Sequence, residues 1–130
     1  MFVDASALVA ILKRESGYQG LADRLDNASA PFTSPIAIVE AVMSLAKQKS
    51  LSVEAARSEI TLLVERSRLD VSPIDERTGQ LAIGAHARYG KNSGHPARLN
   101  LGDCFAYAMA KQHGVPLLYK GDDFSQTDLA

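Results

Sequence analysis

The stretch "NLGDCFAYAMAKQHGVPLLYKGDDF", residues 100–124, decides the fold. Its first half is apolar on almost every side from Cys104 to Ala110, a pattern that predicts a buried helix. The apolar run that follows predicts a short strand. Asp103 stands at the start of the helix, and Asp122 and Asp123 come just after the strand. Acids in such places either cap or turn the chain or take part in chemistry, and the remaining residues have to distinguish these roles.

Three more short strand patterns alternate with helical patterns along the chain. The strand patterns are "MFVD", "APFTSP" and "LDVSPI", and helices are predicted over residues 5–15, 18–28, 34–50, 51–68 and 76–90. Gly17 is expected to end the first helix, and Ser34 followed by Pro35 is a preferred helix start. This alternation predicts an α/β fold with a mostly parallel sheet covered by helices. No linker is long enough to divide the chain, so we predict one domain over residues 1–130.

Composition excludes several classes of protein. The 130 residues carry a net charge of −1, which by itself indicates no acidic or basic partner. The single cysteine, Cys104, lies in an apolar run and rules out an internal disulfide, which fits a reducing cytoplasm. We find neither an apolar run near ~18 residues nor a charged segment followed by an apolar one. We therefore expect no signal peptide, no membrane span and a cytoplasmic location.

Acidic residues follow two of the predicted strands. Asp4 comes directly after "MFV", and the pair Asp122 and Asp123 comes after "PLLYKG". Functional groups of parallel α/β sheets gather at the carboxyl ends of strands. Asp103 begins the buried helix that leads into the last strand. Glu40 lies inside a helix with Ile36, Val39 and Met43 around it, which places it on an apolar face, where a carboxylate is costly unless it is paired or bound to metal.

Each acid also has an ordinary structural explanation. Asp4 could cap the helix that follows it, a role worth about 1 kcal/mol. Asp103 could sit at the third helical position behind an Asn100 cap, where it meets the helix dipole favourably. Gly-Asp-Asp is a turn signal, and Glu40 could reach solvent or pair with a lysine. Taken one at a time, the acids leave the question open.

The fold brings these acids together, which changes the argument. Three or four converging carboxylates without a lysine partner repel each other, so some must be protonated unless a divalent cation neutralises them. Oxygen-only ligands select a hard ion such as Mg²⁺ or Mn²⁺. A site of this kind orients water and stabilises charge on a phosphodiester during in-line displacement.

Four blocks of the sequence resemble the signature blocks of the PIN-domain family, and in particular its VapC ribonuclease toxins. The blocks are "FVDASALVAIL", "SPIAIVEAVMSLA", "LNLGDCFAYAMAK" and "PLLYKGDDFSQTDL", and they cover nearly the whole chain in order. The resemblance implies a three-layer α/β/α sandwich with a short, mostly parallel sheet. It also implies a Mg²⁺- or Mn²⁺-dependent RNA endonuclease that acts as the toxin of a toxin–antitoxin pair.

The resemblance assigns roles residue by residue. The family's acids fall on Asp4, Glu40 and Asp103, with Asp123 as the fourth and Asp122 as the neighbouring candidate. Asp4 and Asp103 would bind the metal directly, and Glu40 would bind it through water or help to activate the attacking water. Asp123 would complete the acidic ring or hold a second ion. The hydroxyl of Ser6 would bond a carboxylate or the substrate phosphate, or cap the helix.

The same resemblance implies partners. These are a cognate VapB-type antitoxin whose C-terminal segment covers the active site, a homodimer, and a toxin–antitoxin hetero-oligomer. A last strand after the "TDL" block would be short or absent, because only Ala130 follows that block.

A basic loop is the candidate for holding RNA against the acidic pocket. The stretch "HARYGKNSGHPARLN" offers Arg88, Lys91 and Arg98, with Tyr89 for stacking on a base, unless it is an ordinary solvated loop. Lys13 and Arg14, at the end of the first helix, are a second candidate.

Two other functions remain open from the sequence. One is a catalytically silent PIN-like module that binds RNA or antitoxin. The other is an Asp-dependent phosphatase, which would need a second acid where Ser6 stands.

Overall fold

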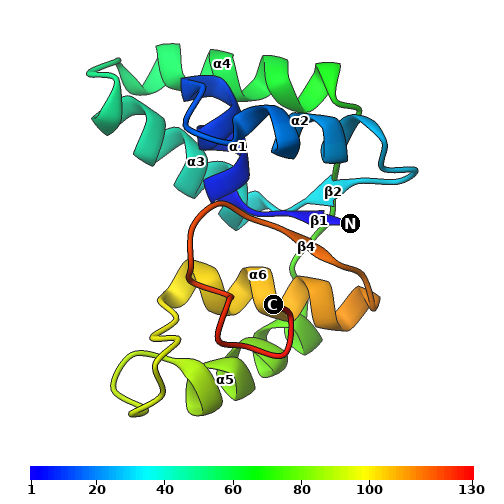
Figure 1. Ribbon diagram of the computed structural model, residues 1–130, viewed down its shortest axis with the longest axis vertical. Helices are drawn as coiled ribbons and strands as arrows, with labels where there is room; N and C mark the ends of the chain where they lie inside the picture. Colours follow the sequence, from blue (N-terminus) through cyan, green and yellow to red (C-terminus); the bar gives the residue numbers. More distant parts are fainter.

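A computed structural model describes residues 1–130 and places a four-stranded parallel sheet at the centre of the molecule (Figure 1). Each strand is two residues long: β1 (Phe2–Val3), β2 (Phe32–Thr33), β3 (Asp70–Val71) and β4 (Leu117–Leu118). The strand order is β3-β2-β1-β4, so the first and last strands of the chain, β1 and β4, lie side by side. The helices are α1 (Ala5–Lys13), α2 (Tyr18–Asp26), α3 (Pro35–Gln48), α4 (Val53–Arg66), α5 (Glu76–Tyr89) and α6 (Leu101–His113).

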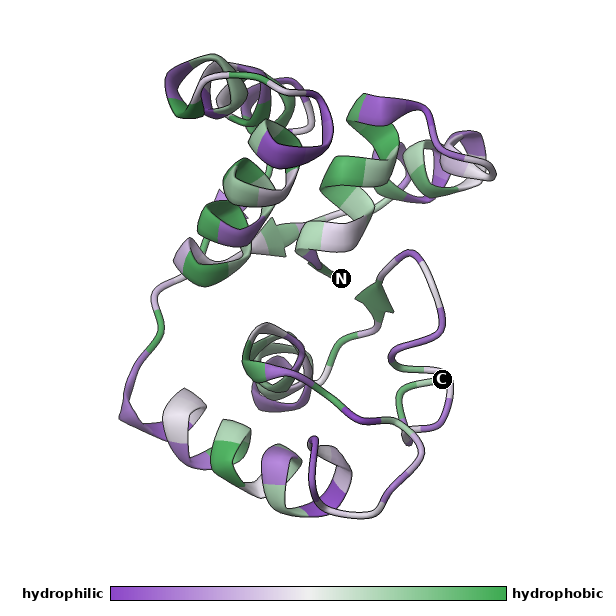
Figure 2. Cartoon of the chain, turned by 90° about the vertical axis from the view of Figure 1, so that its left-hand side faces the viewer, coloured by the Kyte–Doolittle hydropathy of each residue, from purple (hydrophilic) through white to green (hydrophobic).

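Helices cover both faces of the sheet. Helices α1 to α4 lie on one face and α5 and α6 on the other, as Figures 1 and 2 show from two directions. Successive strand residues point to opposite faces, so Phe2 and Leu117 pack with α5 and α6, whereas Val3 and Leu118 pack with α1 to α4. Two separate hydrophobic cores result, one on each side of the sheet. The predicted three-layer α/β/α sandwich is confirmed, and every strand pairing is parallel.

Local sequence signals fix most helix starts. Asp4, Ser34, Ser52, Asp75 and Asn100 each cap a helix through a side-chain oxygen that accepts a backbone N–H. Two of these caps follow directly after β1 and β2, so the end of each of these strands is also the beginning of a helix. Helices therefore begin at the carboxyl edge of the sheet, and their first backbone N–H groups require polar side chains there as hydrogen-bond acceptors.

The end of the first helix differs from the prediction. Helix α1 ends at Lys13, and Arg14 takes the left-handed conformation that closes it, with φ of 52°. Gly17, with φ of 83°, instead precedes α2 as its N-cap. No strand follows β4, as expected. The residues after it form turns anchored by Phe124, whose side chain is fully buried. None of the helices combines the length and the apolar character needed to span a membrane.

Candidate active site

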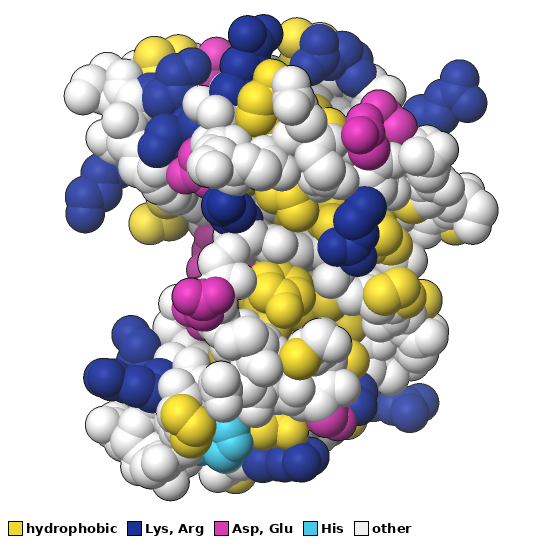
Figure 3. Space-filling view, in the orientation of Figure 1, with side chains coloured by type: hydrophobic (Ala, Val, Ile, Leu, Met, Phe, Trp, Pro, Cys, Tyr) yellow, Lys and Arg dark blue, Asp and Glu magenta, His cyan; other side chains and the backbone are white.

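The carboxyl edge of the sheet opens into a pocket of about 320 Å³ that contains all four acids of the predicted site. Asp4, Glu40, Asp103 and Asp123 line it, although they come from four separate segments of the chain. In the space-filling view the surface is notched at this level, and acidic side chains lie in the notch between the two helical layers (Figure 3). The structure therefore brings the predicted acids together, and the pocket is open to solvent.

Asp4 stands at the junction of β1 and α1 and is 5% exposed. Its backbone N–H donates to the Leu118 carbonyl at 3.0 Å, which ties it to the end of β4. Its Oδ2 accepts the Ser6 backbone N–H at 3.1 Å and the Ser6 hydroxyl at 2.5 Å. The Ser6 hydroxyl in turn accepts the backbone N–H of Lys120 at 3.0 Å. Ser6 thus bonds a carboxylate, one of its predicted roles, and links the ends of the adjacent strands β1 and β4.

Asp103 occupies the third position of α6 and forms a reciprocal capping box with Asn100. The Asn100 side chain accepts the Asp103 N–H at 2.8 Å, and Asp103 Oδ2 accepts the Asn100 N–H at 3.1 Å. Asp103 is 8% exposed and also lines the acidic pocket. Asp103 therefore takes part in the helix cap and also lies in the shared acidic pocket, the two possibilities considered from the sequence.

Glu40 reaches the pocket from α3, as predicted. The face of α3 that is buried, however, is not the one predicted from the sequence. The buried face of α3 consists of Ala37, Ala41, Val42 and Leu45. Val39 and Met43, expected to lie with Glu40 on an apolar core face, are 56% and 65% exposed. That expectation was wrong, because α3 has two apolar stripes, and the one that carries Ala37, Ala41, Val42 and Leu45 packs into the core. Glu40 lies at the border between them and is half-buried.

The structure distinguishes the two adjacent acids after β4. Asp123 lines the pocket, whereas Asp122 does not. The carbonyl of Asp122 instead accepts the Ser125 backbone N–H at 3.1 Å and the Ser125 hydroxyl at 2.7 Å, so this residue shapes the turn. The buried ring of Phe124 packs edge-on against Tyr119 and anchors the turn that carries Asp123.

The electrostatics of the pocket favour neutral acids or a bound cation. The pKa of Asp103 is raised to about 7, chiefly by burial and further by the charges of Asp123, Asp4 and Glu40, while the hydrogen bond from Asn100 opposes the rise. Burial is also the main reason that the pKa values of Asp4 and Glu40 are raised. No Lys or Arg forms an ion pair with any of these acids. Each acid is repelled by the negative charges of the others, and a divalent cation in the pocket would neutralise those charges.

The donor set of the pocket fits a hard cation, although the side chains do not form a closed cage. The pocket offers carboxylate, hydroxyl and amide oxygens and contains no His or Cys. No group of three or more His, Cys, Asp or Glu side chains has the geometry of a finished metal site. Oδ2 of Asp4 and Oδ2 of Asp103 take the hydrogen bonds of the two helix starts, and none of these bonds uses Oδ1 of either residue. A cation could therefore be held without breaking a cap.

A lysine lines the pocket, although the sequence indicated no lysine partner for these acids. Lys120 follows β4 by two residues, and its ammonium group donates to the Ser16 carbonyl on the α1–α2 connection. The rule that drew attention to Asp4, that functional residues gather just after the strands of a parallel sheet, would also have found Lys120. Glu15 and Gln48 also line the pocket, and both are contacted by Lys13.

The predicted RNA-binding residues lie outside the acidic pocket. Lys91 lines an apolar groove that shares Asn100 with the pocket, so this groove adjoins the acids. Arg98 is exposed in the loop before α6, and the guanidinium of Arg88 lies 4.6 Å from the centre of the Tyr89 ring. Tyr89 is only 2% exposed, because its ring packs against Tyr107 and His95, so the expectation that it stacks on a base was wrong.

Comparison with known proteins places the chain in a family. The PIN domain family model matches residues 1–129. A VapC ribonuclease of Rhizobium meliloti is 45% identical over 98% of this chain and 98% of its own length. Ribonucleases VapC28 and VapC42 of Mycobacterium tuberculosis are each 41% identical, over 98% and 99% of this chain and 93% and 96% of their own lengths.

A solved structure agrees with these relatives. M. tuberculosis VapC20, described as a sarcin–ricin loop cleaving toxin, has a TM-score of 0.73 to this chain and covers 95% of it, with 92% of that protein matched. At 17% identity this similarity shows the shared fold. Family model, relatives and fold agree, and the chain belongs to the PIN-domain family, among its VapC ribonucleases.

Proposed function

We propose that this VapC-family ribonuclease hydrolyses RNA phosphodiester bonds in the pocket around Asp4, with Mg²⁺ or Mn²⁺ as cofactor, as the toxin of a toxin–antitoxin pair. One observation carries the proposal. Four carboxylates from separate segments line a single open pocket, and none has a Lys or Arg ion-pair partner. Because such a cluster costs stability, its presence points to a function. Segments near both ends of the chain contribute to the pocket, so we also propose that residues 1–130 act as one domain.

The acids have distinct proposed roles. Asp4 and Asp103 would hold the cation directly, and each has an oxygen that its helix start does not require. When bound, a divalent cation would neutralise the charge of the pocket and would supply stabilisation of negative charge on the phosphate. Glu40 is less buried than Asp4 and has a raised pKa, so it is suited to orient the attacking water and accept its proton. Asp123 completes the acidic ring from the turn after β4.

Basic residues beside the pocket suit a nucleic-acid strand laid across its mouth. Lys120 lies in the pocket wall and Lys91 in the adjoining groove, and we propose that both meet phosphates. Arg98, which is exposed in the loop before α6, is proposed as a further phosphate contact. RNA binding by Arg88 stays a prediction, because its guanidinium lies over the ring of Tyr89. The target RNA is cytoplasmic in this proposal, which fits the reduced, buried Cys104.

Large apolar side chains left exposed on α3, α5 and α6 support the proposed partners. Val39 and Met43 on α3, Leu101 on α6 and Ile83 on α5 are each more than half exposed. Exposed groups of large apolar residues typically mark protein interfaces. We propose that they serve a homodimer and that a VapB-type antitoxin segment covers the acidic pocket in a hetero-oligomer. Light scattering of the isolated chain measures the first, and an antitoxin that blocks Mn²⁺ binding would establish the second.

A cleavage assay with matched substitutions tests the proposed active site. The chain, freed of antitoxin, is incubated with structured RNAs and Mg²⁺ or Mn²⁺. Asp4→Asn and Asp123→Asn should reduce cleavage by about 100-fold or more, and EDTA should abolish it. Asp122→Asn is the matched control, because Asp122 is the next residue but lies outside the pocket, and it should cleave normally.

Other outcomes would contradict the proposal. Cleavage that survives both Asp4→Asn and EDTA would exclude the acidic metal site. A folded wild-type chain that cleaves no RNA would favour a binding module, and hydrolysis of a phosphomonoester alone would favour a phosphatase.

A further inference from the structure

Gly102, the second residue of α6, has no conformational reason to be glycine. Four glycines in the chain have positive φ, and Gly102 is not among them. It lies inside a regular helix, where alanine is intrinsically more favourable than glycine. It is also buried, whereas glycines elsewhere on the helices of this protein face open space. The reason for glycine at this position therefore lies in what surrounds it.

The space beside Gly102 is filled by Glu40. A Cβ atom built on Gly102 would lie within 3.0 Å of both carboxylate oxygens and of Cδ of Glu40, closer than real Cβ atoms come to other heavy atoms. These are the three nearest atoms, and none of them is backbone. The two residues come from α3 and α6, which lie on opposite faces of the sheet. The Glu40 carboxylate thus occupies the volume of the side chain that Gly102 lacks.

This contact determines where the Glu40 carboxylate lies in the pocket. Gly102 is adjacent in sequence to Asp103, and the capping box between Asn100 and Asp103 fixes the start of α6. A carboxylate pressed against the Gly102 Cα is therefore also held beside Asp103. Any side chain at position 102 would have to move it.

We propose that Gly102 is a positioning residue that holds the Glu40 carboxylate beside Asp103 by leaving room for it. The expectation that the pocket binds a cation rests on the proposed function. The steric contact between Gly102 and Glu40 does not depend on that function. Because the carboxylate is the far end of a flexible side chain, a methyl group at position 102 displaces Glu40 and leaves the helix in place. The fold should survive Gly102→Ala, while the acidic pocket loses one of its groups.

Two measurements on Gly102→Ala test this inference, with Gly84→Ala as the matched control. Gly84 lies in α5 with no atom within 4 Å of a built Cβ, so its substitution should change neither measurement. In the metal-free protein, the ¹³C signal of the Glu40 carboxyl carbon, assigned by its loss in Glu40→Gln, should shift in Gly102→Ala. Mn²⁺ binding measured by calorimetry should weaken by about 10-fold or more. Unchanged values of both in a folded Gly102→Ala protein would overturn the inference.

Double variants separate a clash with Glu40 from general damage to α6. Glu40→Asp shortens the side chain, so Gly102→Ala with Glu40→Asp should bind Mn²⁺ more tightly than Gly102→Ala alone. Gly102→Ala with Glu40→Ala should fold as well as Glu40→Ala, even if Gly102→Ala alone does not. A double variant that fails to fold would show that the methyl meets something else, and the inference would be wrong.

The same experiment distinguishes failure of the inference from failure of the proposed function. If the wild-type chain neither binds Mn²⁺ nor cleaves RNA, the proposed function fails. In that case, a shifted Glu40 carboxyl signal in Gly102→Ala still supports the steric inference, and an unshifted one overturns it.

Discussion

Asp103→Asn should make the metal-free protein more stable while removing its function. The substitution keeps the size of the side chain, and the Asn oxygen can still accept the Asn100 N–H, so the helix cap survives. What it removes is a carboxylate whose pKa is raised to about 7 from 3.8 by burial and by the neighbouring acids. A gain in stability on removal of this carboxylate would show that the wild-type protein gives up folding free energy to keep the acid in the site.

The size of the effect follows from that pKa. At about 1.36 kcal/mol per pH unit, the rise corresponds to roughly 4 kcal/mol. This is a ceiling, because the pocket is open to water and solvent screening reduces it, so we expect about 1–2 kcal/mol. For a chain of this length that gain raises the melting temperature by about 3–8 °C.

The pH dependence gives the prediction its sign. Because the folded pKa of Asp103 lies above the unfolded one, the folded state holds a proton that the unfolded state has lost between about pH 4 and pH 7. Wild-type stability from this group is therefore complete below about pH 4 and is lost as the pH rises towards 7. The advantage of Asp103→Asn should grow over that window and stay constant above it.

Urea unfolding in EDTA at about pH 4, 5.5 and 8 measures this advantage. Mn²⁺ added in place of EDTA should make the wild type more stable than Asp103→Asn, because a ligand stabilises only the protein that binds it. An advantage that is the same at every pH, or a variant less stable than wild type at pH 8, would refute the electrostatic reasoning.

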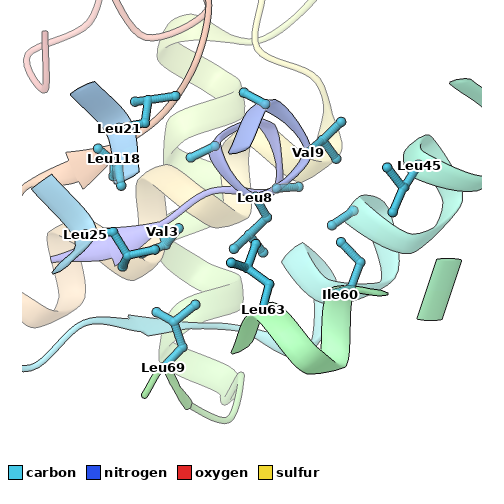
Figure 4. Close-up of a cluster of buried hydrophobic side chains, with 14 of the residues drawn as sticks. Val3, Leu8, Val9, Leu21, Leu25, Leu45, Ile60, Leu63, Leu69 and Leu118 are labelled. Atoms are coloured by element: carbon cyan, nitrogen blue, oxygen red, sulfur yellow. The ribbon is translucent and has the colours of Figure 1, made fainter. Parts of the chain in front are cut away.

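Three further predictions test the fold and the site. Leu8→Ala should cost about 3–5 kcal/mol of unfolding free energy, because Leu8 is fully buried among the side chains in Figure 4, whereas Leu62→Ala on the exposed face of α4 should cost far less. Ser6→Ala removes the hydroxyl that lowers the pKa of Asp4, so that pKa should rise further and Mn²⁺ binding should weaken, as NMR titration and calorimetry would show. Asp128→Asn removes the ion pair in which Asp128 lies 2.6 Å from the Lys111 ammonium, so hydrogen exchange over residues 124–129 should speed up while exchange in α1 to α4 stays unchanged.

Local signals made much of the fold predictable from the sequence. Ser34 and Pro35 start α3, and Asn100 caps α6, because caps depend on residues within one turn of each other. The strands are only two residues long, yet their apolar runs and the acids after them were enough to place the carboxyl edge of the sheet. From that edge, the meeting of Asp4 with the pair Asp122 and Asp123 followed from topology, whereas the choice of Asp123 came from the family resemblance.

The features that the sequence did not reveal depend on tertiary packing. Periodicity shows that α3 has apolar stripes, but it cannot tell which one the core accepts, and the core took Ala37 and Ala41 rather than Val39 and Met43. Tyr89 reads as an aromatic residue in a basic loop, but the packing of α5 against α6 buries its ring. The contact between Gly102 and Glu40 joins residues on opposite sides of the sheet, and no local pattern records it.

Capping and chemistry are not alternative roles for the acids of this protein. A carboxylate has two oxygens, and in both Asp4 and Asp103 Oδ2 accepts the hydrogen bonds of the helix start. Those bonds lower the pKa of each acid and hold its side chain in one orientation, so the cap fixes the direction of the remaining oxygen. Because α1 begins where β1 ends and α6 leads into β4, both acids reach the same pocket with one oxygen free of the cap. Capping is therefore the means by which this fold can hold buried acids in place for a cation.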